Sequence, residues 1–89
     1  MNYLQMISEL EELVRQRGIL IRYEKGDFEG GYCILKDQQI LVVNKRLHDA
    51  RKASVLALAL GEIGVDGVFL KPAVRSYIEE EAARAAKQK

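Results

Sequence analysis

Apolar side chains recur at helical spacing over residues 3–17. The apolar positions of this segment are Leu4, Ile7, Leu10, Leu13 and Val14. Charged and amide side chains occupy the positions between them, which predicts an amphipathic helix with one buried face. Asn2 and Gln5 form the pattern of a capping box at its start, and Gly18 stands where a left-handed cap would end it.

Shorter apolar runs follow, with the composition of strands rather than helices. Three segments are rich in Ile, Leu, Val and Tyr: 19–23, 32–36 and 39–44. Residues 24–31 predict a loop, whose glycines we interpret as hinges. Asp37 and Gln38 predict a tight turn between the last two strands. Because the strands follow one another along the chain, we expect them to pair as an antiparallel meander.

Residues 48–63 are apolar on nearly every side, which predicts a central helix with several neighbours packed around it. Gly64 ends this helix, and Pro72 fits the first turn of a last one. The apolar stripe of the last helix comprises Val74, Tyr77, Ile78 and Ala82. Its end, residues 82–89, is rich in alanine but has little to anchor it, so we expect it to fray.

This order of elements predicts a single α+β domain over residues 1–89. We expect an N-terminal helix, a three-stranded antiparallel sheet and two C-terminal helices packed on the sheet. A chain of 89 residues supports one core and a shallow groove rather than a deep, enclosed active site.

Composition narrows the range of functions. The chain is 48% hydrophobic and 30% charged, as is usual for a soluble globular protein, and its net charge of +1 indicates no particular partner. The single cysteine excludes an internal disulfide and a zinc ribbon. The first residues lack a basic leader, and no apolar run reaches membrane-spanning length. We therefore expect a cytoplasmic protein that does not contact a membrane.

Residues 40–64 contain a strand end, a charged turn and a helix rich in small residues. The positions concerned are Val42-Val43-Asn44, Arg51-Lys52, Ala57 and Leu60-Gly61. In these residues the chain resembles the small zinc peptidases of the ImmA/IrrE class, and the resemblance extends over residues 1–64. It implies a peptidase-like scaffold of helix, sheet and helix.

The chain departs from that class at the positions that carry the chemistry. Leu58 stands at the first zinc-ligand position, Ala59 at the general base and Glu62 at the second histidine. The mechanism needs two imidazoles four residues apart on one helix face, with a carboxylate over the bound water. We therefore expect no metal, no cofactor and no peptidase activity. The alternative is an ordinary buried helix, in which Gly61 permits close approach to the sheet.

Cys33 and His48 are the remaining candidates for nucleophile and base. Cys33 lies in a predicted strand between Tyr32 and Ile34, where a lone cysteine is usually a small buried side chain. His48 lies at a helix start among polar residues and is expected to be solvated. Phe28 either folds back over the core, which we expect, or offers a contact for a partner.

The most basic segment is 44–52, at the start of the central helix. Its Lys45, Arg46, Arg51 and Lys52 could bind phosphate, carboxylate or an acidic partner near the helix N-terminus. Arg75 is a further candidate for anion or partner binding. Its structural alternative is an ion pair with Glu79 or Glu62. Residues 79–81 predict a solvated face, with Glu80 paired to Arg84.

Taken together, these patterns favour a small non-catalytic interaction or adaptor protein. Its partner is another protein or a second copy of the chain, in a homodimer formed through the apolar ends of the helices. The alternative is a nucleic-acid or phosphoanion binding module that uses residues 45–52. A third hypothesis, an enzyme that uses Cys33 or Glu62, has no positive support in the sequence.

Overall fold

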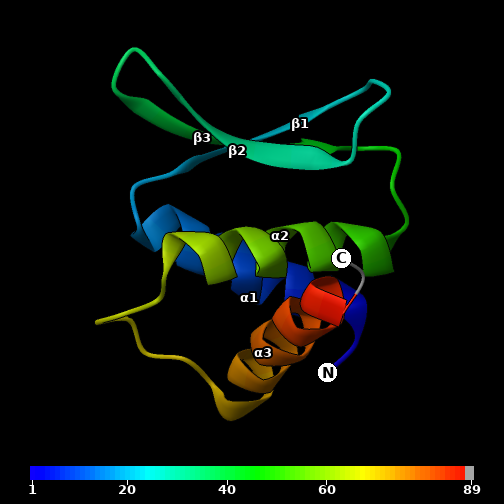
Figure 1. Ribbon diagram of the computed structural model, residues 1–89, viewed down its shortest axis with the longest axis vertical. Coiled ribbons are helices and arrows are strands. Elements are labelled where there is room, and N and C mark those ends of the chain that lie inside the picture. The colour runs from blue at the N-terminus through cyan, green and yellow to red at the C-terminus, as the bar shows by residue number, and fades with distance from the viewer. Residues whose placement is uncertain (88–89) are drawn as a thin grey trace.

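Three helices lie on one side of a three-stranded sheet in the computed structural model, which describes residues 1–87 (Figure 1). In chain order the elements are α1 (Tyr3–Gln16), β1 (Leu20–Glu24), β2 (Gly30–Leu35), β3 (Gln38–Asn44), α2 (Asp49–Ile63) and α3 (Pro72–Lys87). The predicted α+β class and the order of its elements are confirmed. None of the described helices is long and apolar enough to cross a bilayer. The fraying expected over 82–89 falls partly on residues 88–89, outside the described residues, and α3 is helical as far as Lys87.

The capping pattern of α1 is confirmed. The Asn2 side chain accepts a hydrogen bond of 2.8 Å from the Gln5 N–H, and the Gln5 side chain accepts one of 3.2 Å from the Asn2 N–H. Gly18 has the expected positive φ of 78°. The assignment of Leu4 to the buried face is wrong, because its side chain is 65% exposed. At about 100° per residue it lies about 120° around the helix from Leu10, and Met6 is buried instead.

The sheet is mixed, so the predicted antiparallel meander is wrong. Its strand order is β1-β3-β2, with β1 parallel and β2 antiparallel to β3. After β1 the chain does not form the neighbouring strand. It first forms β2, one position further away, and β3 then inserts between β1 and β2. In this central position Ile40, Leu41 and Val43 are buried, whereas the equally long apolar run from Tyr32 to Leu35 lies on the edge strand β2 and is mostly exposed.

The hairpin turn between β2 and β3 lies one residue earlier than predicted. Its two residues are Lys36 and Asp37, with φ of 50° and 67°, and Gln38 already belongs to β3. Positive φ at both positions is the geometry of the two-residue turn whose twist matches the flanking strands.

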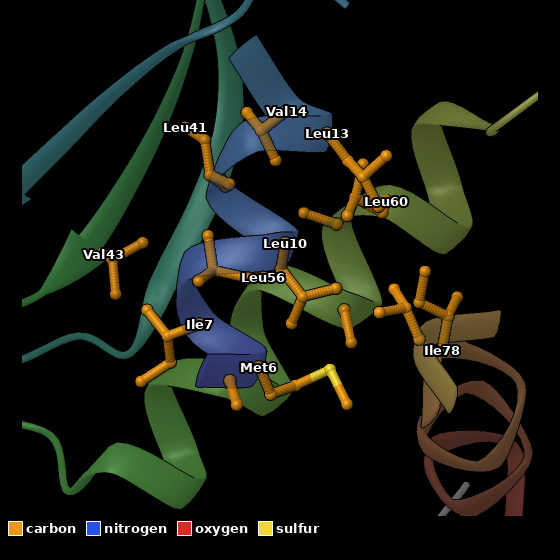
Figure 2. Close-up of a cluster of buried hydrophobic side chains, with 14 of the residues drawn as sticks. Met6, Ile7, Leu10, Leu13, Val14, Leu41, Val43, Leu56, Leu60 and Ile78 are labelled. Carbon is orange, nitrogen blue, oxygen red and sulfur yellow. The ribbon is translucent and has the colours of Figure 1, made fainter. Parts of the chain in front are cut away.

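The core lies between the sheet and the helices. Figure 2 shows side chains of α1, such as Leu10 and Val14, meeting Leu41 of β3 and Leu56 and Leu60 of α2. Helix α2 packs against α1, α3, β2 and β3, as its lack of a polar face predicts. Helix α3 packs against α1 and α2 rather than on the sheet, so only one of the two C-terminal helices covers it.

Close approach of backbones occurs at Gly30 and not at Gly61. A Cβ atom built on Gly30 would lie 2.5 Å from the carbonyl oxygen of Val42 and 2.8 Å from the side chain of Val55. One built on Gly61 would meet nothing within 4 Å. The predicted packing role of Gly61 is therefore wrong. Gly30 starts β2 instead of serving as a hinge in the preceding loop.

Candidate functional site

One face of the sheet is not covered by any helix within residues 1–87. Helix α1 packs against β1, and α2 packs against β2 and β3, on the same side (Figure 1). Because side chains alternate along a strand, the register assigns residues to each face. The uncovered face carries Leu20, Arg22, Glu24, Gly31, Cys33, Leu35, Gln38, Ile40 and Val42.

A band of apolar side chains crosses this uncovered face. Ile40 of β3 is the register partner of Leu20 on one side and of Cys33 on the other. Ile40 is only 6% exposed although it does not belong to the core cluster, because strands flank it on both sides. Leu35 on the same face is 57% exposed. The exposed parts of the band are therefore Leu20 on one side of Ile40 and Cys33 and Leu35 on the other, and exposed apolar side chains on one face are typical of contact with another molecule.

Strand β2 is a free edge of the sheet, and its unpaired backbone groups can be identified. The Asn44 N–H donates a hydrogen bond of 2.9 Å to the Glu29 carbonyl, which makes this pair a hydrogen-bonded one. Hydrogen-bonded pairs recur at every second residue of an antiparallel ladder, so the backbone N–H and C=O groups of Cys33 also bond to β3, at Ile40. The N–H and C=O groups of Tyr32 and Ile34 therefore point away from the sheet.

The two edges of the sheet differ in charge. Strand β1 carries Arg22 and Glu24, which form an ion pair of 3.1 Å on the uncovered face. Strand β2 carries no charged residue from Gly30 to Leu35. Charged side chains on an edge strand discourage pairing with another chain. The charged side chains therefore protect the β1 edge against pairing with another chain, and the β2 edge has no such charges.

Ile34 completes the exposed surface of β2. It lies on the same face as Tyr32, towards the helices, but it is 63% exposed because it lies beyond their cover. The local sequence around Ile34, Leu35 and Leu20 does not mark them as site residues. The signal that marks the edge is the lack of any charge over β2.

Cys33 is not the buried side chain that a lone cysteine in a strand usually is. Its side chain is exposed, because it lies on the uncovered face of an edge strand. His48 precedes α2 as its N-cap residue, and its side chain makes no capping hydrogen bond. Cys33 pairs with Ile40, and Asn44 lies about 13 Å further along β3. His48 follows Asn44 in the chain, after the end of β3. The fold thus places the predicted nucleophile and base on separate elements.

Asn44 holds the loop after β1 against the turn before α2. Its Nδ2 donates hydrogen bonds of 2.8 Å to the Gly26 carbonyl and 2.7 Å to the Phe28 carbonyl. Its Oδ1 accepts a hydrogen bond of 3.0 Å from the Arg46 N–H. The side chain is buried, so these bonds satisfy all of its polar groups away from water.

The predicted basic cluster is partly used by contacts within the chain. Lys45 and Arg46 are exposed in the turn that Asn44 organises. Arg51 forms an ion pair with Glu29. The Nζ of Lys52 lies 5.8 Å from the centre of the Tyr23 ring, a cation–π distance.

Arg75 lies apart from the other four predicted basic residues. It lines a small pocket with residues 65–68 and Glu79, near the end of α2, whereas Lys45 and Arg46 precede its start. The length of α2, 15 residues, separates the two ends by about 22 Å. The ion pairs among residues 1–87 do not include Arg75, so the predicted bond to Glu79 or Glu62 is not formed. Exposed pairs of this kind gain little in water.

Phe28 does not fold over the core. Its ring is exposed and packs against Gly26 of its own loop, where an added Cβ would overlap it. Asn44 holds the Phe28 backbone, so this position follows from the loop conformation rather than from burial of the ring.

A groove of about 530 Å³ lies between α1, α2 and α3. Tyr77, the buried Ser54 and the buried Glu81 line it. Glu81 is buried because it follows Val74 and Ile78 along the face that α3 turns to the other helices. It pairs with Arg84 at 2.9 Å, so the prediction of a solvated Glu81 and a Glu80–Arg84 pair is wrong.

Two tyrosines have altered acidities. Burial and then the Glu81 carboxylate raise the pKa of Tyr77 to about 12. Burial also raises the pKa of Tyr23, together with the hydrogen bond that its hydroxyl donates to Glu11. Both shifts keep the hydroxyl groups neutral, and the Tyr23–Glu11 bond joins β1 to α1.

The three residues at which the sequence was compared with the catalytic groups of a peptidase class all lie on α2. Leu58, Ala59 and Glu62 line a shallow pocket beside Gly30 and Gly31 of β2. Among residues 1–87 there is no group of three or more His, Cys, Asp or Glu side chains that could hold a metal ion.

Comparison with family models, characterised proteins and solved structures gives no match for this chain.

Proposed function

We propose that this chain is a non-catalytic, cytoplasmic interaction protein that binds other protein chains through the edge of β2 and the adjoining uncovered face. The observation that carries the proposal is the uncharged free edge from Gly30 to Leu35. A strand from another protein can pair with the outward backbone groups of Tyr32 and Ile34. Its side chains would meet the apolar band beside them.

Backbone and side-chain features contribute differently to such binding. Main-chain hydrogen bonds to an edge strand give affinity with little dependence on the partner's sequence. The exposed Ile34 and Leu35 favour apolar side chains at alternate positions of the partner strand. The charged β1 edge directs the partner to β2, since Arg22 and Glu24 would have to lose water there.

Affinity capture with matched variants tests this proposal. Tagged wild type, Ile34→Lys and Phe69→Lys are used to retain proteins from the native host, which mass spectrometry identifies. Phe69 is the control, because it is 82% exposed and lies in the loop before α3. The proposal predicts that Ile34→Lys loses proteins that the wild type and Phe69→Lys retain. Equal retention by all three, or retention of no chain at all, would contradict it.

The second candidate is a phosphoanion or nucleic-acid binding module at residues 45–52. It is supported by the exposed Lys45 and Arg46 beside a helix start that has no side-chain cap. The engagement of Arg51 by Glu29 and of Lys52 by Tyr23 counts against it. A titration of labelled single-stranded DNA and RNA at low salt tests whether this segment binds nucleic acid. Affinity that survives replacement of all four basic residues would exclude this candidate.

The resemblance to ImmA/IrrE peptidases enters the proposal only as a scaffold. A leucine and an alanine at the positions of the first ligand and the base supply no donor atoms. The proposal is therefore a protein-binding role without catalysis, and it requires neither a metal nor a cofactor.

A further inference from the structure

We propose that the strand which pairs with β2 belongs to a second copy of this chain, so that two sheets join edge to edge about Cys33. This inference rests on the proposed function of the β2 edge and names its occupant. It differs from association through the apolar ends of the helices, which the sequence alone suggests.

Symmetry limits how two β2 strands can pair. A two-fold axis perpendicular to the sheet sets one residue opposite its own copy in an antiparallel pair. Side chains opposite one another then point to the same face, so all helices lie on one side of the joined sheet. The residue at the axis must belong to β2, and the registers that keep most of the strand paired are centred on Tyr32, Cys33 or Ile34.

The register centred on Cys33 matches the side chains best. It sets Tyr32 opposite the partner's Ile34, which is an aromatic and β-branched pair of the kind that stabilises sheets. It also sets Leu35 opposite the partner's Gly31, where the missing side chain leaves room for it. Both contacts occur twice, once on each side of the axis.

The Cys33 register brings charges together only beyond the strand ends, where Glu29 faces the partner's Asp37, whereas the other two registers bring a charge into the apolar part of the joint. Centring on Tyr32 sets Ile34 opposite the partner's Gly30 and leaves Glu29 beside the partner's Leu35. Centring on Ile34 sets Tyr32 opposite the partner's Lys36 and moves the turn residues into the ladder. Only the Cys33 register keeps every charged side chain out of the apolar part of the joint.

The backbone of β2 is suited to this register. Tyr32 and Ile34 direct their N–H and C=O groups outward, so each pair of Tyr32 with the partner's Ile34 exchanges both hydrogen bonds. The central Cys33 pair is then of the non-hydrogen-bonded type, with Cα atoms about 4.5 Å apart. That separation falls within the range that a disulfide can bridge, so the native thiol reports the register.

Cross-linking and sedimentation together test the inference. Diamide oxidises two facing thiols to a disulfide and takes up their two protons and two electrons. The wild type is compared with a variant that carries Cys33→Ser and Leu35→Cys, whose thiols would face the partner's Gly31 and not each other. Sedimentation velocity over a range of concentrations, with the thiols reduced, measures the dimer without any covalent bond.

Two further variants show whether dimerisation depends on the β2 edge or on the rest of the exposed sheet surface. Ile34→Lys places a charge at the joint, and Leu20→Lys makes the same kind of change on the uncovered face at the far edge. Both side chains are largely exposed, so both variants should fold, and circular dichroism verifies this. We expect Ile34→Lys to raise the dissociation constant about tenfold or more, because two cross-strand pairs are lost. We expect little change from Leu20→Lys.

The outcomes distinguish this inference from the function on which it rests. Fast cross-linking of the wild type alone, with a dimer that Ile34→Lys weakens, supports it. A chain that stays monomeric, or a dimer unaffected by Ile34→Lys, overturns it. If the monomeric chain still captures a different protein through Ile34, the homodimer fails and the proposed function stands. If it captures none, both fail.

Discussion

Asn44 connects two loops through one buried side chain, and the fold around the start of α2 depends on it. Asn44→Asp keeps the oxygen that accepts from the Arg46 N–H but removes the two N–H donors to Gly26 and Phe28. A carboxylate would then face two carbonyl oxygens. We expect the free energy of unfolding in urea to fall by about 1–3 kcal/mol.

The same replacement at Asn2 is the control. Asn2 is an exposed N-cap residue, where aspartate caps as well as asparagine, so Asn2→Asp should leave the stability nearly unchanged. Equal stabilities of the two variants would show that the Asn44 side chain contributes no more than a surface cap.

Gly30 and Gly31 are neighbours with different surroundings. A Cβ at Gly30 would overlap the Val42 carbonyl, whereas a Cβ at Gly31 would meet nothing. We expect Gly30→Ala to destabilise the protein by about 1–3 kcal/mol through overpacking. Gly31→Ala should be neutral or slightly stabilising, because alanine restricts the unfolded chain. Thermal unfolding of both variants measures the difference, and similar midpoints would refute the close approach.

Tyr77 makes stability depend on pH in the alkaline range. Its pKa rises from 10 to about 12 on folding, so the folded state holds the proton more tightly. The resulting stability is present below pH 10 and is lost as the pH rises from 10 to about 12. Tyr77→Phe should therefore show a smaller loss over this interval than the wild type. Urea unfolding at several pH values gives the comparison, and an unchanged loss would exclude this role. Some loss remains because the pKa of Tyr23 is also raised.

At the scale of elements, α2 contains a glycine that packing does not require. Gly61 lies in the last turn of α2, and an added methyl group would meet no neighbour. We expect Gly61→Ala to stabilise the protein by up to about 1 kcal/mol, the difference in helix propensity. Gly64→Ala is the opposite case, because Gly64 has φ of 95° and an L-residue there is strained. Thermal unfolding of the pair should show shifts of opposite sign, and loss of stability in Gly61→Ala would contradict this account.

Helices were predictable from the sequence because their signals are local. The capping box of Asn2 and Gln5, the cap at Gly18 and the start at Pro72 all depend on residues within one or two turns. Strands were predictable only to within one or two residues, and the turn was displaced to Lys36 and Asp37.

Strand order was not predictable in the same way. Whether β1 pairs with β2 or with β3 depends on contacts between distant segments, which spacing along the chain does not report. A continuous apolar run does not distinguish the strands either, since residues 40–43 of the central strand and residues 32–35 of the edge strand both form one. The exposure of Cys33 follows from strand order in turn, because only an edge strand on an uncovered face leaves it accessible.

In the whole molecule, the candidate surface comprises the β2 edge and the face of the sheet that no helix among residues 1–87 covers. All three helices lie on one side of the sheet, and α3 packs on α1 and α2 without reaching the sheet (Figure 1). The basic residues 45, 46, 51, 52 and 75 could be identified from the sequence, but their separation, the ion pair of Arg51 and the cation–π contact of Lys52 could not. The free edge at β2 required the register, because it is defined by which backbone groups β3 leaves unpaired.

Hydrogen exchange at the amides of β2 shows whether a strand from another chain pairs with this edge. The Cys33 amide bonds to β3, whereas those of Tyr32 and Ile34 point outward. We expect the Tyr32 and Ile34 amides to exchange fast in dilute protein and to become protected at high concentration or with a captured partner. Cys33 should be protected throughout, as the internal reference. If Tyr32 and Ile34 exchange equally fast under all these conditions, no strand pairs with this edge and the account is contradicted.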